Sequence, residues 1–134
     1  MQLKVTRSQE KKGMMSKSVK FMLTARLDLT EEEKFAVDEY KLGDLVIYNS
    51  EAAQKHLEGY QNSTSTLGSL ARVAMAKMSL NLTINNLTAG KTVECSTLDE
   101  VIGAEESIKE ACENVKSYIG VAQTFDGREE SFEF

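Results

Sequence analysis

Hydrophobic and polar residues alternate most regularly between residues 19 and 29, and more briefly between residues 2 and 8. A period of two residues is typical of a β-strand with one buried face. The connection between the two stretches is mostly polar and basic around Gly13. The two stretches therefore predict an N-terminal β-hairpin over residues 2–29. The apolar face of its longer strand consists of Val19, Phe21, Leu23, Ala25, Leu27 and Leu29.

Two helices are predicted to begin at threonine residues. Thr30 and Thr97 are each followed three residues later by a glutamate, which is the arrangement of a capping box. The helix after Thr30 has a modest apolar face, and Gly43 is a candidate for its left-handed end. We expect that face to consist of Phe35, Ala36 and Tyr40.

The helix after Thr97 has the strongest signal in the chain. Its apolar residues recur at spacings of three and four, which is typical of an amphipathic helix and is also the a/d spacing of a coiled coil. We place this long helix at residues 97–120, although the spacing continues to Phe125, so the end stays open between Gly120 and Phe125. The stripe consists of Val101, Ala104, Ile108, Ala111, Val115 and Tyr118, and Ile102, Cys112 and Ile119 widen it to a core-facing face.

Shorter signals fill the middle of the chain. They predict a strand at 45–48 and a short helix from Ser50 to Leu57, followed by a loop at 61–69. Residues 70–77 fit a helix or a strand equally well. After them, the pattern predicts two strands joined by a turn. The two strands are at 78–84 and 91–95, with the turn at 85–90. This order predicts an α+β fold: an antiparallel sheet of about five strands, with the long C-terminal amphipathic helix and one or two shorter helices packed on one face.

The length of 134 residues is that of one domain, residues 1–134. The chain has no proline, where roughly 5% is the average, so its turns are predicted to use glycine. Residues 121–134 form a tail in which Glu130, Phe132 and Phe134 alternate with polar residues. Exposed phenylalanines are unfavourable in water, so we expect Phe132 and Phe134 to dock on this chain or on a partner protein.

The net charge of −5 is unevenly distributed. Residues 1–30 contain seven basic and two acidic side chains, whereas residues 31–134 contain nine basic and nineteen acidic ones. One interpretation is that a basic hairpin packs beside an acidic helix and the two fields cancel. The other is that the hairpin contacts phosphates of a nucleic acid. The candidate phosphate-contacting residues are Lys4, Arg7, Lys11, Lys12, Lys17 and Lys20.

Candidate catalytic and metal-ligating residues are few. One histidine and two cysteines cannot supply the four ligands of a structural zinc site. Gly90-Lys91-Thr92 ends like a phosphate-binding loop, but position 85 is not glycine and a strand pattern follows. Two kinds of group remain for an enzyme: a thiol at Cys95 or Cys112, and a base at His56 or Glu105. Each also has a structural interpretation. The cysteines fit as small buried apolar residues, Glu105 as part of a solvated helix face, and His56 as a solvent-facing or partly buried helix residue. We assign no catalytic residue, no metal site and no cofactor.

These observations favour a small accessory or regulatory protein that acts by protein–protein interaction, with self-association as one form of it. The alternative is a nucleic-acid-binding protein that uses the basic hairpin, and an enzyme is a distant third. No segment has the ~20 apolar residues of a membrane span, and no signal-peptide pattern is present, so we expect a cytoplasmic protein without a membrane partner.

Overall fold

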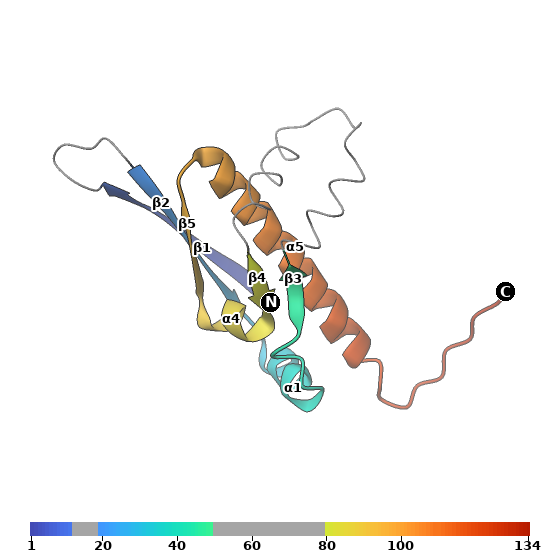
Figure 1. The fold of residues 1–134 in the computed structure, drawn as a ribbon. Helices are drawn as coiled ribbons and strands as arrows, with labels where there is room; N and C mark the ends of the chain where they lie inside the picture. Colours follow the sequence, from blue (N-terminus) through green and yellow to red (C-terminus); the bar gives the residue numbers. More distant parts are fainter. Residues whose placement is uncertain (12–18, 50–79) are drawn as a thin grey trace.

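The computed structural model describes residues 1–11, 19–49 and 80–134 (Figure 1). The remaining residues contain several of the sequence predictions: the helix at 50–57, the loop at 61–69 and the ambiguous segment at 70–77. They also contain His56, Lys12 and Lys17. These predictions lie outside the described residues.

The described fold is α+β and has two antiparallel sheets. The larger sheet has the strand order β1-β2-β5, with β1 at Gln2–Lys11, β2 at Val19–Asp28 and β5 at Lys91–Cys95. The smaller sheet pairs β3 at Val46–Asn49 with β4 at Asn81–Thr83. The expectation of one sheet of about five strands is therefore met only loosely, because the strands are divided between two sheets.

The hairpin of β1 and β2 is confirmed with the predicted faces. Leu3 lies opposite Leu27, and Val5 lies opposite Ala25. On β2 the side chains of Leu23, Ala25 and Leu27 are buried, as the alternation predicted. Strand β1 is longer than predicted, because it continues from Ser8 to Lys11.

Helix α5, at Leu98–Ala122, lies across the larger sheet and also contacts β3 (Figure 1). Its buried face follows the 3.6-residue period of a single helix packed in a core. Ile119 is buried, whereas Tyr118 is exposed, so the predicted a/d stripe is wrong at its last position. The helix ends at Ala122, between the two ends that the sequence left open, and Gly120 does not interrupt it.

Helix α1, at Glu31–Glu39, has the predicted capping box at Thr30 and Glu33. It ends earlier than expected, and Lys41 rather than Gly43 adopts a positive φ. Its buried residues are Ala36 and Val37, whereas Phe35 and Tyr40 are exposed, so the predicted apolar face is only partly right. Gly43 has a different role, because a Cβ there would lie 2.5 Å from the Asn85 side chain.

The turn predicted at 85–90 is instead helix α4, at Ile84–Ala89. Thr83 and Asn86 form a capping box, and Ile84 and Leu87, three residues apart, are both buried. Because α4 separates β4 from β5, these strands join different sheets rather than one hairpin. The alternating pattern over 78–84 concealed this change because Ile84 fits the end of a strand as well as the start of a helix.

Candidate functional site

The basic side chains of the hairpin that the structure describes are paired with carboxylates. Lys4 Nζ lies 2.8 Å from Asp28 Oδ2, Lys20 Nζ lies 3.5 Å from Glu94 Oε2, and Arg7 contacts Glu105 of α5. Lys11 is the last residue of β1, and Lys12 and Lys17 lie outside the described residues. The pairing of Arg7 with the acidic helix agrees with the interpretation in which the two charge fields cancel. Phosphate contact by these residues stays a prediction.

On the outer face of the hairpin, two cations share one carboxylate. Lys4 lies directly opposite Arg26 in the β1–β2 register. The only described carboxylate that forms an ion pair with either is Asp28, 2.8 Å from Lys4 and 3.1 Å from Arg26. A hydrogen bond from Lys4, with the positive charge of Arg26, lowers the pKa of Asp28. This site has one positive charge more than its carboxylate neutralises.

The helix-facing side of β1 repeats this arrangement. Glu105 accepts a hydrogen bond from Arg7, and its Oε1 also lies 4.0 Å from Lys109 Nζ, one turn further along α5. The sequence interpretation of Glu105 as part of a solvated helix face is incomplete, since its side chain is only 20% exposed. Here too, among the described residues, two cations share a single carboxylate.

Next to this pair, an open groove of about 610 Å³ runs between β1 and α5. Because α5 packs over β2 rather than β1, the apolar side chains of β1 are only half-buried. The β1–α5 groove has an apolar floor and a charged rim. The floor includes Leu3, Val5, Leu27 and Cys112, and the rim includes Lys109, Glu113 and Lys116. This groove was not predicted from the sequence, although apolar residues such as Leu3 and Val5 on a strand at the edge of a sheet are a signal for one.

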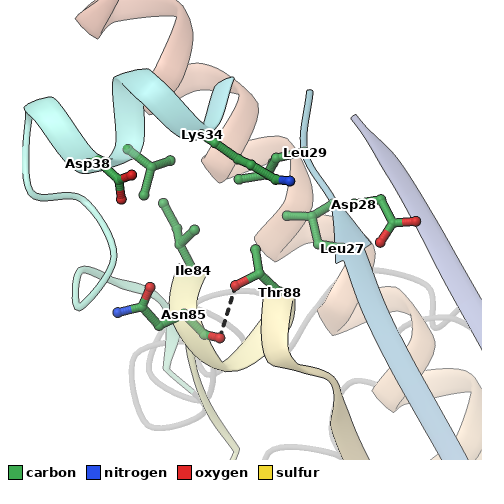
Figure 2. A pocket seen from close by; sticks show the side chains of 9 residues that line it. Leu27, Asp28, Leu29, Lys34, Asp38, Ile84, Asn85 and Thr88 are labelled. Carbon is green, nitrogen blue, oxygen red and sulfur yellow. Dashed lines mark hydrogen bonds between the residues drawn. The ribbon is translucent and has the colours of Figure 1, made fainter. Parts of the chain in front are cut away.

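A second cavity, of about 580 Å³, lies between the end of β2, α1 and α4 (Figure 2). Figure 2 shows Lys34 and Asp38 on the α1 side and Asn85 and Thr88 on the α4 side. Three of its polar side chains have partners within the fold: Lys34 pairs with Glu31 at 3.3 Å, Asn85 donates to Asp44, and Thr88 donates to the Asn85 carbonyl. The Asn85 side chain therefore links α4 to the loop before β3, whereas the other two interactions lie within α1 and within α4.

Neither cysteine has the features of a nucleophile. Burial raises the pKa of the Cys95 thiol, and it raises the pKa of Cys112 to about 11. A thiolate is needed for nucleophilic attack, and both environments disfavour it. The structural interpretation of the two cysteines as small apolar residues fits their positions in the core and at the groove floor. In the part of the chain that the structure describes, no three His, Cys, Asp or Glu residues are arranged to hold a metal ion.

Most described aromatic side chains are exposed. Tyr48 is buried and Phe21 half-buried, whereas six others are exposed: Phe35, Tyr40, Tyr118, Phe125, Phe132 and Phe134. Tyr40 and Phe125 contact each other, with ring centroids 6.3 Å apart. Val121 is exposed one turn before Phe125, and Tyr118 is exposed one turn earlier still. We call Tyr40, Tyr118, Val121 and Phe125 the aromatic patch; sequence analysis had assigned the first two to the core.

Helix α5 includes the first two residues of the segment 121–134 that the sequence assigned to a tail. From here on, the tail means residues 128–134, which extend away from the sheets (Figure 1). It follows a turn in which Gly127 has a φ of 86° and Arg128 forms two hydrogen bonds with the Asp126 carboxylate through its Nε and Nη2 atoms. Phe132 and Phe134 are both exposed, with Phe132 at 74%. They do not dock on the described residues of their own chain.

Two further observations bear on the nature of the chain. No helix among the described residues is long and apolar enough to cross a lipid bilayer. Comparison of the chain with protein-family models, with curated proteins and with solved structures gave no significant match.

Proposed function

We propose that this chain is a small accessory or regulatory protein of the cytoplasm that acts by binding another protein. The observation that carries the proposal is the exposure of aromatic side chains on the aromatic patch and the tail. Aromatic residues are enriched in protein–protein interfaces, where they contribute much of the binding energy. Exposed contiguous apolar surface on a soluble domain commonly marks an interaction site.

The cytoplasmic part of the proposal is supported by the two free cysteines, Cys95 and Cys112. Disulfides are rare in the reducing cytosol, and a small secreted domain more often uses its cysteines in bridges. We name no reaction, because burial raises the pKa of both cysteine thiols and so disfavours a cysteine nucleophile.

The test compares the proteins captured by three tagged forms of the full chain: wild type, Phe132→Ser with Phe134→Ser, and Phe35→Ser. Phe35 is a matched control because it is an exposed phenylalanine, at 67%, on α1 rather than on the tail. We expect the wild-type chain to enrich at least one partner protein about tenfold or more. The tail variant should no longer capture that protein, whereas the Phe35→Ser control should still capture it. The captured protein is then purified and its binding to the three forms measured directly. Identical capture profiles for all three forms would contradict the role of the tail.

The nucleic-acid alternative gives a different result in the same samples. Binding to phosphates depends strongly on salt and on the lysines of the hairpin, and not on phenylalanines of the tail. Lys11→Glu with Lys12→Glu therefore discriminates between the two functions. The alternative is favoured if wild type captures a nucleic acid that this variant loses, and if no protein is captured in a tail-dependent way.

A further inference from the structure

The tail matches strand β1 of this chain, residue by residue, in one antiparallel register. When Phe132 is set opposite Val5, Phe134 lies opposite Leu3, and every apolar residue faces an apolar one. In the same register Glu133 lies opposite Lys4, and Glu130 lies opposite Arg7. Side chains directly opposite on neighbouring strands contact each other, and opposite charges there are favourable.

The match is specific to that register. A shift by two residues in one direction places Glu130 opposite Val5 and Arg128 opposite Arg7. A shift in the other direction places Phe132 opposite Arg7 and Glu129 opposite Glu10. Odd shifts are excluded, because they place the two phenylalanines on the wrong face of the sheet.

The faces of the larger sheet agree with this register. Leu3, Val5 and Arg7 lie on the side of the sheet that faces α5, where the β1–α5 groove is open. A strand added to β1 would point Phe132 and Phe134 into this groove, next to its apolar floor. Strand β1 is at the edge of its sheet, and no described strand pairs with its outer side. Such an edge accepts an extended segment through backbone hydrogen bonds.

Two of the three glutamates of the tail, Glu130 and Glu133, meet the two sites that have an excess positive charge. Lys4 and Arg26 share Asp28, so Glu133 would bring a second carboxylate to this pair. Arg7 and Lys109 share Glu105, so Glu130 would do the same on the other face. Charge complementarity is therefore present on both faces of the added strand.

The tail of the same molecule is not placed to occupy this position. Strand β1 runs antiparallel to α5, because its start lies beside Lys116 and Arg7 lies beside Glu105. In the matched register Glu129 lies opposite Ser8, next to Arg7 and therefore beside Glu105 of α5. Glu105 and Ala122 are about 25 Å apart along the helix, at 1.5 Å per residue. Seven residues cover this distance only when every one of them is fully extended, at about 3.3–3.6 Å per residue. Residues 123–128 instead form hydrogen-bonded turns, and they lead the tail away from the sheet (Figure 1).

We therefore propose that the tail of one copy of this chain adds as a fourth antiparallel strand to the β1 edge of a second copy, with Phe132 and Phe134 in its β1–α5 groove. This inference rests on the proposed function, since it names a second copy as a partner of the tail. Reciprocal exchange of two tails closes a twofold dimer, which is the commonest symmetric assembly. Each contact then buries two phenylalanines and pairs two glutamates.

The first experiment measures the mass of the purified full chain by analytical ultracentrifugation across a wide range of concentrations. We expect a monomer–dimer equilibrium. Phe132→Ser with Phe134→Ser should raise the dissociation constant at least about 100-fold, given the transfer free energy of two phenylalanine side chains. A dimer that persists unchanged in this variant would overturn the proposal.

The second experiment tests the register with a matched pair of charge reversals. Glu133→Lys places a lysine opposite Lys4 and should weaken the dimer several-fold, whereas Glu129→Lys makes the same charge change opposite Ser8 and should change little. Adding Lys4→Glu to Glu133→Lys should restore part of the affinity. Equal effects of the two reversals, or no recovery in the double variant, would contradict the register.

The third experiment separates exchange from other contacts. A fluorescent peptide of residues 126–134 is titrated into the Phe132→Ser, Phe134→Ser protein, whose β1 edge is intact, and anisotropy is measured. We expect saturable binding that Lys4→Glu weakens. A monomer at all concentrations, with no peptide binding, would refute tail exchange. The proposed function is decided separately, by tail-dependent capture of a different protein.

Discussion

A buried hydrogen bond fixes the small sheet against the long helix. Ser107 Oγ of α5 donates to Tyr48 Oη of β3 at 3.0 Å, and Ser107 is 2% exposed. Asn114 adds a second link, from its side-chain amide to the Ile47 carbonyl at 2.8 Å. The first link can be dissected by three variants: Tyr48→Phe, Ser107→Ala, and both together.

The expected magnitudes follow from what each variant leaves behind. A typical intramolecular hydrogen bond contributes about 1 kcal/mol to the free energy of unfolding, and leaving a buried polar group without its partner lowers that free energy by about 1–3 kcal/mol. Ser107→Ala leaves the Tyr48 hydroxyl without a hydrogen-bond partner, so the free energy of unfolding should fall by about 1–2 kcal/mol. Tyr48→Phe should have a smaller effect, because a helical serine can turn to a carbonyl of its own helix. The double variant leaves neither hydroxyl unpaired, because both are absent. Its loss of unfolding free energy should therefore be smaller than the sum of the two single losses, by about 1 kcal/mol.

Urea unfolding of the four proteins, followed by circular dichroism, measures these differences. Tyr118→Phe is the matched control, because Tyr118 is 46% exposed and its hydroxyl has no described partner. It should change the free energy of unfolding by less than about 0.5 kcal/mol. Additive effects of Tyr48→Phe and Ser107→Ala would show that the two hydroxyls do not interact, and the packing of β3 on α5 would then need another explanation.

Three further predictions concern single sites. Thr30→Ala removes the capping box of α1 and should lower the free energy of unfolding by about 1 kcal/mol in urea titrations, whereas Thr30→Ser should keep most of it. Hydrogen bonds from Arg128 lower the pKa of Asp126 to about 2, below its ordinary value of 3.8. Any stability that this pair contributes is therefore complete above about pH 4 and disappears as the pH falls towards 2. An NMR titration should find the Asp126 midpoint near 2 in the wild type and near its ordinary value in Arg128→Ala. Cys112, whose pKa burial raises to about 11, should be alkylated far more slowly at pH 8 in the folded protein than in urea.

The sequence predicts well those elements that local periodicity and capping define. The apolar face of β2 and the N-termini of α1 and α5 depend on residues within a few positions of each other. Thr97 does accept a hydrogen bond from the Glu100 amide, although the Glu100 carboxylate accepts one from the Ser96 amide rather than from Thr97 itself. Local patterns therefore place an element and its buried face to within a few residues.

Periodicity does not predict which strands pair or which apolar residues the core reaches. The partition into two sheets depends on α4, a helix of six residues whose signal overlaps a strand pattern. Tyr118 and Ile119 are adjacent on α5 and both fit its apolar face, yet only Ile119 is buried. The pairs Arg7–Glu105 and Lys4–Asp28 likewise require knowledge of the register and of the side of the sheet that α5 covers.

The position of Arg7 makes the β1 edge selective among strands that approach it. An exposed edge of ten residues would otherwise pair with many extended segments, and an inward-pointing charge is one of the ways in which proteins prevent this. A second β1 strand, paired antiparallel about Thr6, would place Val5 opposite Arg7 and cover the guanidinium with an apolar side chain. A strand with a carboxylate at that position adds a favourable pair instead. In the proposed tail exchange, Arg7 would therefore disfavour this pairing of β1 with itself and favour a strand with the sequence of the tail.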